Sequence, residues 1–171
     1  KMIFFQLPIN STSLGQLSVL LLKEFFARKL EFGLFPIGEV QVTFEQWPQE
    51  FIMEIQEAIF RGHTKYKLGD PVLKLWHLGG SELATPNQTL LTFHELDQLT
   101  ERELNIISNQ KVIVTSKYSQ RILGGSLLPL GFDDLSFKKI NINPLAKNGQ
   151  IHFGLVGKLE KRKAHIQAVR A

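Results

Sequence analysis

A cluster of cations follows the last apolar run of this 171-residue chain, and its composition suits a phosphate group. Residues 151–156 read as a buried strand, Gly157 follows it, and Lys158 and Lys163 precede a predicted helix. Free backbone amides at a helix start, together with ammonium groups, bind a diphosphate well. A solvated, charged helix end is the alternative, but the strand and the glycine before the cluster favour the phosphate site.

Two histidines lie where predicted strands end, which is where open α/β sheets bind their ligands. His94 directly follows the apolar run 89–93, and Glu95 beside it could orient the titratable ring for acid-base chemistry. The alternative is an acidic cluster that stabilises a helix N-terminus. His77 ends the run 72–77 and precedes Gly79 and Gly80, where a ligand could approach the backbone closely. A histidine beside a flexible turn is the alternative there.

A third loop, residues 10–15, joins the first predicted strand to a helix. Its one glycine, Gly15, is too little for the G-x-G-x-x-G fingerprint of dinucleotide-binding proteins, so a binding loop and a plain turn both stay open. The chain has no cysteine, and its five histidines are scattered without metal-ligand spacing. We therefore expect no metal site, no thiol nucleophile and no bound cofactor.

The charge of the chain is concentrated at its end. Five of the 20 Lys and Arg and one of the 16 Asp and Glu fall in residues 157–171, which leaves fifteen of each sign before them. Nucleic-acid binding needs several spread phosphate contacts, so this distribution speaks against it. No run approaches the ~20 apolar residues of a transmembrane segment. The start of the chain reads as a first strand and not as a signal peptide, and a cytoplasmic location fits these features.

Strands and helices alternate along the chain, which predicts an α/β fold with a mainly parallel sheet and helices on both faces. Trp47-Pro48 is predicted to start one helix and Gly62 to end it, while Thr100 and Glu103 form a capping box for another. Ser116 is predicted to cap a short helix over residues 117–123. The predicted strands are residues 3–7, 30–37, 72–77, 89–93, 111–115 and 126–130.

The order of these elements predicts two domains. Residues 1–135 would form one complete lobe, residues 136–149 a linker, and residues 150–171 the beginning of a second, truncated lobe. A lone strand and helix cannot bury both of their faces. Apolar residues such as Ile166 and Val169 would then be covered either by the first lobe or by a second copy, and the second case would make a homo-oligomer through residues 150–171.

Three segments resemble the two-lobed (GT-B fold) glycosyltransferases, in particular the large retaining group. Residues 116–123 look like the segment after a late strand of the first lobe, and residues 128–133, Leu-Pro-Leu-Gly-Phe-Asp, resemble the Val-Pro-Asn-Gly-Val-Asp signature of that group. Residues 154–163 resemble the strand-Gly-Arg-x-x-x-x-Lys-Gly opening of the second lobe, with Ala164 in place of the final glycine. The three segments occur in the order that the family shows.

The resemblance implies a Rossmann-like acceptor-side lobe in an enzyme of glycan biosynthesis. That enzyme would transfer sugar from a nucleotide-diphosphate sugar to a glycan or lipid acceptor, with retention and without a metal. It would be cytoplasmic, including at a membrane surface. By position, Lys158, Lys163, Gly157 and Gly15 would contact the donor diphosphate, His94 would lie near the transferred sugar as the catalytic residue, and His77 and Glu95 would contact the acceptor or sugar.

The same resemblance implies that the chain alone is inactive, because the remainder of the second lobe, with the paired glutamates that bind donor sugar and ribose, is not among its residues. Two other interpretations stay open. One is a non-catalytic α/β interaction module whose basic tail docks on an anionic partner. The other is a nucleotide-binding enzyme of another two-lobed class, such as an epimerase, because unrelated functions share such folds.

Overall fold

The computed structural model describes residues 2–41, 47–131, 154, 157 and 164–170 of the chain. It divides into two compact units, residues 1–132 and residues 133–171, and each is described by itself. The predicted linker, residues 136–149, and the predicted strand over residues 151–153 and 155–156 lie outside the described residues. The fold that follows is therefore that of the first unit.

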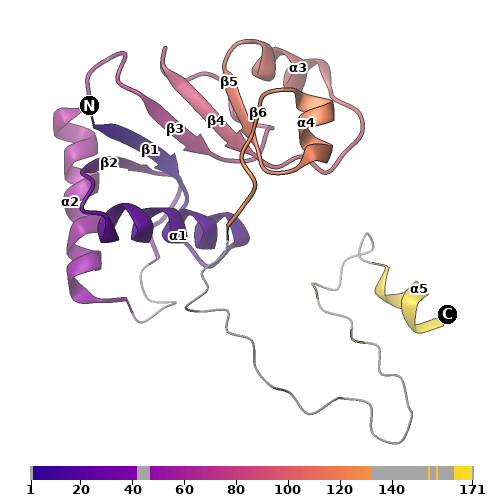
Figure 1. The fold of residues 1–171 in the computed structure, drawn as a ribbon, viewed down its shortest axis with the longest axis horizontal. Helices are drawn as coiled ribbons and strands as arrows, with labels where there is room; N and C mark the ends of the chain where they lie inside the picture. Colours follow the sequence, from indigo (N-terminus) through magenta and orange to yellow (C-terminus); the bar gives the residue numbers. More distant parts are fainter. Residues whose placement is uncertain (1, 42–46, 132–153, 155–156, 158–163, 171) are drawn as a thin grey trace, which may run out of the picture. The chain divides into compact units, whose positions relative to one another are not determined.

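The first unit contains a six-stranded sheet in which all neighbouring strands are parallel, in the order β2-β1-β3-β4-β5-β6 (Figure 1). This confirms the predicted Rossmann-like α/β fold. All six predicted strands of this unit are present, although most are shorter than predicted. Their bounds are β1 Ile3–Leu7, β2 Phe32–Pro36, β3 Val72–Leu75, β4 Gln88–Thr92, β5 Lys111–Val114 and β6 Ser126–Leu127.

Four helices connect these strands, and three of them begin at a capping side chain. Thr12 accepts a hydrogen bond from the Gly15 amide, Thr100 and Glu103 form the predicted reciprocal capping box, and Ser116 accepts from the Ser119 amide. Such caps satisfy amide groups that have no partner inside the helix. The bounds are α1 Ser13–Ala27, α2 Gln49–Lys65, α3 Glu101–Ser108 and α4 Lys117–Leu123.

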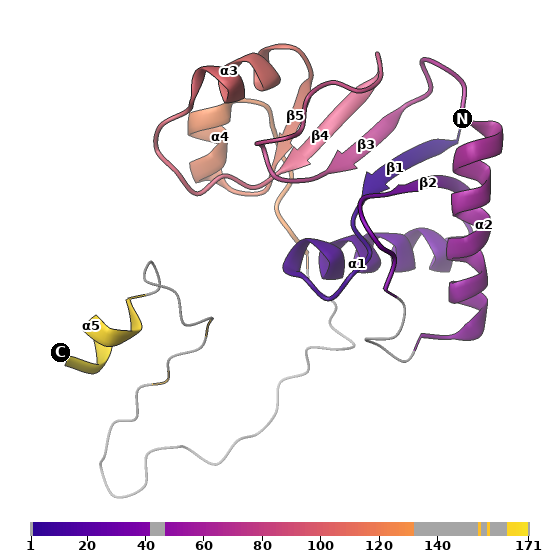
Figure 2. The ribbon, with the colours of Figure 1, turned by 180° about the vertical axis from the view of Figure 1, so that it is seen from behind.

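The two faces of the sheet carry separate cores, because successive residues of a strand point to opposite faces. On one face Leu91 of β4 packs in a cluster with Phe5 of β1 and with Val19 of α1. On the other face the preceding residue of the strand, Leu90, packs with Ile106 of α3 and Leu123 of α4. Figures 1 and 2 show α3 and α4 beside β5, at the end of the sheet away from α2. Helices thus cover both faces, as predicted.

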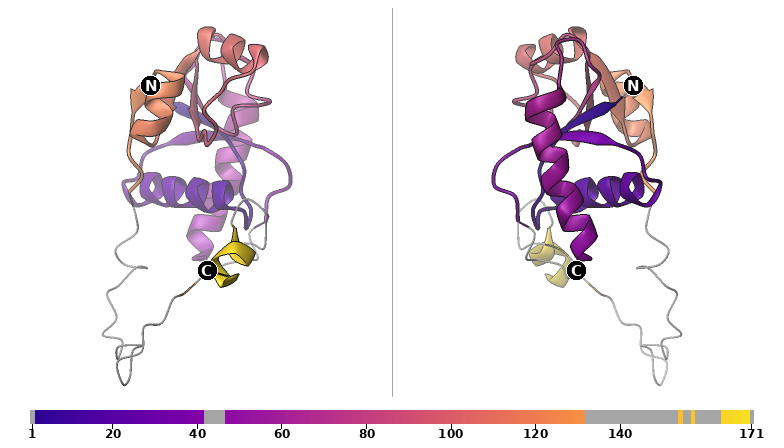
Figure 3. Two further views of the ribbon diagram at one scale, coloured as in Figure 1. Left: turned by 90° about the vertical axis from the view of Figure 1, so that its right-hand side faces the viewer. Right: turned by 90° about the vertical axis from the view of Figure 1, so that its left-hand side faces the viewer.

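Helix α2 lies along the outer edge of β2. Arg61 donates from Nε to the Phe32 carbonyl at 2.7 Å, and a Cβ added to Gly62 would stand 2.4 Å from the Leu34 carbonyl oxygen. The predicted end of the helix at Gly62 is wrong: α2 continues to Lys65, and the glycine lets backbone meet backbone. Figure 3 shows α1 and α2 running in crossed directions, with the Phe26 and Phe51 rings 5.5 Å apart between them.

The second unit has one described helix, α5 His165–Arg170. Its apolar side chains Ile166 and Val169 are 65% and 79% exposed, and their predicted burial, by the first lobe or by a second copy, stays a prediction. Among the described residues, no helix is both long enough and apolar enough to cross a membrane.

Candidate functional site

The strand order creates one switch point at the carboxyl ends of the strands. The chain moves from β1 outward to β2 and then returns to the other side of β1 to form β3. The loops that leave β1 and β3 therefore diverge, and open α/β sheets bind ligands in the crevice between such loops. Here these loops are residues 8–12 and 76–81, so Asn10 and His77 belong to the switch point, and Gly15 lies in the first turn of α1, directly after the first loop.

The local backbone structure explains why residue 15 is a glycine. A Cβ at this position would stand 2.2 Å from the carbonyl oxygen and 2.3 Å from Oδ1 of Asn10. Asn10 Oδ1 accepts from the amide and the hydroxyl of Thr12, and the Gly15 amide is itself bound to Thr12 Oγ1. The glycine thus admits a tight turn at the start of α1, and its predicted contact with a diphosphate stays a prediction.

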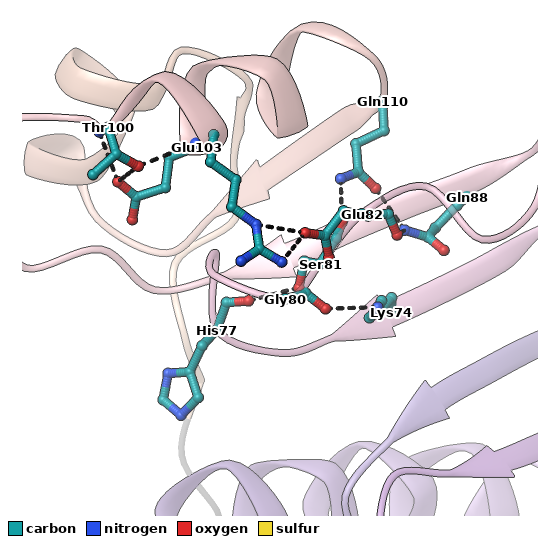
Figure 4. A network of polar contacts seen from close by, with 10 residues as sticks. Lys74, His77, Gly80, Ser81, Glu82, Gln88, Thr100, Glu103 and Gln110 are labelled. Atoms are coloured by element: carbon teal, nitrogen blue, oxygen red, sulfur yellow. Dashed lines mark hydrogen bonds and ion pairs between the residues drawn. The ribbon is translucent and has the colours of Figure 1, made fainter.

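His77 is exposed at the carboxyl end of β3. Its backbone carbonyl accepts a hydrogen bond from Ser81 Oγ at 2.6 Å, and its ring packs edge-on against Trp76 at 5.4 Å between centroids. In Figure 4 the ring points away from the surrounding polar contacts, on the side where α1 runs. The backbone of His77 is therefore fixed while its imidazole is presented to solvent, which suits a contact with a ligand.

The loop that follows His77 has no helix and is held by polar side chains instead (Figure 4). Lys74 Nζ donates to the Gly80 carbonyl, Gln110 donates to the Ser81 carbonyl at 2.6 Å, and Arg102 pairs with Glu82. Burial lowers the pKa of Lys74, and the negative charge of Glu82 opposes that shift. The two glycines predicted to admit a ligand thus belong to a structural loop, although Gly79 itself faces open space.

His94 is 8% exposed and lies two residues beyond the end of β4. Its Nε2 is buried and has no hydrogen-bond partner, and the same holds for Oγ1 of the fully buried Thr92. An unpaired buried polar group costs about 1–3 kcal/mol, so such groups call for an explanation. Because Nε2 is fully buried, a ligand hydroxyl could bond to it only if the residues that cover it move aside.

A carboxylate of another element, Glu103, also acts on His94, and the predicted role of Glu95 stays a prediction. Glu95 is exposed, whereas Glu103 of α3 interacts electrostatically with His94. The pKa of Glu103 lies below its usual range, chiefly because the Thr100 backbone amide and hydroxyl donate to the carboxylate, with a smaller contribution from His94. Sequence spacing could not reveal this pairing, because α3 folds back over β4 and brings together residues nine positions apart.

Lys158 and Lys163 lie outside the described residues, while Gly157 is exposed and has the His165 ring beside it. Among the residues that the structure does describe, no three His, Cys, Asp or Glu side chains gather as metal ligands would.

Two hollows lie at the opposite, amino-terminal end of the sheet. One of 410 Å³ is lined by Met2, Ile3, Phe25, Leu30 and Glu31, and one of 280 Å³ shares Leu30 and Glu31 with it. The charged groups at the second hollow largely pair with one another, since Arg61 bonds Glu54. Neither hollow contains a histidine or a loop of the switch point, so neither carries any of the predicted site residues.

Comparisons with protein-family models, with curated proteins and with solved structures gave no match to this chain.

Proposed function

We propose that residues 1–132 are the acceptor-side lobe of a glycosyltransferase that uses a nucleotide-diphosphate sugar. The observation that carries the proposal is the pair of histidines at the carboxyl ends of the neighbouring strands β3 and β4, beside the switch point. His77 is exposed there, and the buried His94 has an Nε2 atom without a partner. A sugar is rich in hydroxyl groups, which both donate to and accept from imidazole nitrogens.

In this proposal each site residue has a distinct role. His94 bonds a hydroxyl of the transferred sugar and stands as the catalytic residue, while His77 and Glu95 contact the acceptor or the sugar. Lys158 and Lys163, with the backbone at Gly157 and Gly15, stabilise the negative charge that develops on the leaving diphosphate. Ammonium groups take the place of a metal ion in that task, so transfer is metal-independent. A glycan or a lipid-linked sugar is the acceptor class.

The proposal is tested by titrating the ¹⁵N-labelled chain with octyl glucoside and octyl mannoside and, separately, with UDP-glucose and GDP-mannose. We expect the glycosides to shift the amide resonances of residues 76–80 and 93–97, because these segments carry the side chains proposed to contact sugar hydroxyls. His94→Ala should weaken that binding at least about fivefold, the effect of losing roughly one hydrogen bond. The control is His63→Ala, which removes an exposed histidine on α2, outside the candidate site.

Glycoside-induced shifts confined to the amino-terminal hollows, or equal binding by His94→Ala and the wild type, would refute this assignment. The interaction module is the second candidate, and the observation that favours it is that Gly15 and Gly80 already make local structural contacts. Salt-sensitive binding to an unrelated DNA duplex, with no response to any sugar, would support the module instead.

A further inference from the structure

A hydroxyl of α4 holds the backbone of His94. Ser119 is 2% exposed, and its Oγ donates to the carbonyl oxygen of His94 at 3.0 Å across 25 residues of sequence. His94 lies two residues past the end of β4, beyond the strand pairing that holds Thr92 opposite Val114. The Ser119 hydroxyl is thus a tether for a residue that the sheet itself does not fix.

The tether is itself fixed by the helix cap. Ser116 Oγ accepts from the Ser119 amide at 3.0 Å and donates to Ser119 Oγ at the same distance. A hydroxyl has one proton and also accepts hydrogen bonds. Because Ser119 Oγ accepts from Ser116, its own proton is free to point at the carbonyl oxygen of His94. Hydrogen bonds that form such chains reinforce one another in a buried setting. The N-cap of α4 therefore sets the orientation of the Ser119 hydroxyl.

We propose that Ser119 is the positioning residue for His94, and that it aims the unpartnered Nε2 of His94 toward the sugar; this last step rests on the proposed function. Reactive side chains need support from neighbours that lock their geometry. Ser119 touches no substrate in this scheme, and it acts only through the carbonyl of His94. Glu103 of α3 completes the surroundings by its electrostatic interaction with the same ring.

The test is a comparison of histidine ring resonances in ¹H–¹⁵N spectra of Ser119→Ala and the wild-type chain. We expect the His94 ring signals to move and those of His63 and His77 to stay. Two controls should leave the His94 ring in place. Ser108→Ala removes a comparable hydrogen bond, in which Ser108 Oγ donates to the Leu104 carbonyl at 2.8 Å. Ile106→Val loosens the core cluster that contains Leu123 of α4, and it leaves the bond to the His94 carbonyl intact. Should Ser119→Ala fail to fold, Ser119→Cys keeps the volume and weakens the donor.

Unchanged His94 ring signals in the folded Ser119 variants would overturn the inference and leave Ser119 as a tie between α4 and the sheet. The ring comparison uses no ligand, so it is independent of the proposed function. The second measurement is octyl glucoside binding, which we expect to weaken about five- to tenfold in Ser119→Ala and to stay unchanged in Ser108→Ala. If the His94 ring signals move in Ser119→Ala but the wild-type chain binds no glycoside, Ser119 does position His94 and the proposed sugar site is refuted.

Discussion

Replacing Gly62 by alanine tests how α2 packs against the edge of the sheet. Gly62 lies inside α2, where alanine is the better helix former by about 1 kcal/mol. Helix propensity alone therefore predicts that Gly62→Ala stabilises the chain. The structure predicts the opposite, because the new Cβ would stand 2.4 Å from the Leu34 carbonyl oxygen and 3.2 Å from the Leu34 amide nitrogen.

The size of the effect follows from what must move. An ordinary contact with that oxygen begins near 3.4 Å, so the helix must retreat from β2 by about 1 Å. Both partners are backbone, and no flexible side chain can yield. Overpacking of this kind costs about 3 kcal/mol at the upper end of its usual range. After the gain of about 1 kcal/mol in propensity, we expect a net loss of about 2 kcal/mol.

Urea unfolding followed by circular dichroism and by the fluorescence of Trp47 and Trp76 measures this loss. The difference between Gln56→Ala and Gln56→Gly, on the exposed side of α2, gives the propensity contribution in the same helix. Gly62→Ala should unfold at a lower urea concentration than the wild type. A gain in stability equal to the Gln56 difference would refute the reasoning, because it would mean that α2 does not approach β2 this closely.

Two further predictions concern helix ends. Lys29 follows the end of α1 with φ 55°, and its amide donates to the Phe26 carbonyl. Glycine is preferred at such a position, so Lys29→Gly should raise the free energy of unfolding by about 0.5–1 kcal/mol. A lower melting temperature of this variant would contradict the prediction. Thr100→Ala should cost about 1 kcal/mol at pH 7. The bonds from Thr100 lower the pKa of the Glu103 carboxyl in the folded chain. The stability that these bonds contribute is therefore fully present above the unfolded-state pKa of Glu103, ~4.3, and is lost as the pH falls through its folded-state pKa. Urea unfolding of Thr100→Ala and the wild type should show that their difference in free energy of unfolding shrinks over this pH range. A difference that stays constant with pH would argue against the role of the Glu103 carboxylate.

Local sequence patterns predicted most of the fold. The helix over residues 117–123 and its Ser116 cap are present as predicted, and so is the capping box of Thr100 and Glu103. These features depend on contacts within four residues, which a sequence displays directly. The same kind of local rule predicted wrongly that Gly62 ends its helix. A glycine is needed there because the Leu34 backbone, 28 residues away in the chain, leaves no room for a Cβ.

The candidate site shows the same division. One apolar run ends in His77 and another stops just before His94, which placed both residues at the carboxyl ends of strands, and the structure has them there. The roles of their neighbours were less visible. The Gly79-Gly80 turn belongs to a loop held by Lys74 and Gln110, and residues 74 and 110 show no common motif in the sequence.

By itself the sequence determined the α/β class, the helix caps and the strand ends at which polar residues gather, because these depend on short-range periodicity and capping chemistry. The tertiary structure alone decided the strand order, which puts the switch point between β1 and β3. It alone paired His94 with Ser119 and Glu103, because pairing across a sheet depends on which elements pack together. A local pattern specifies an element, whereas a site needs the placement of several elements at once.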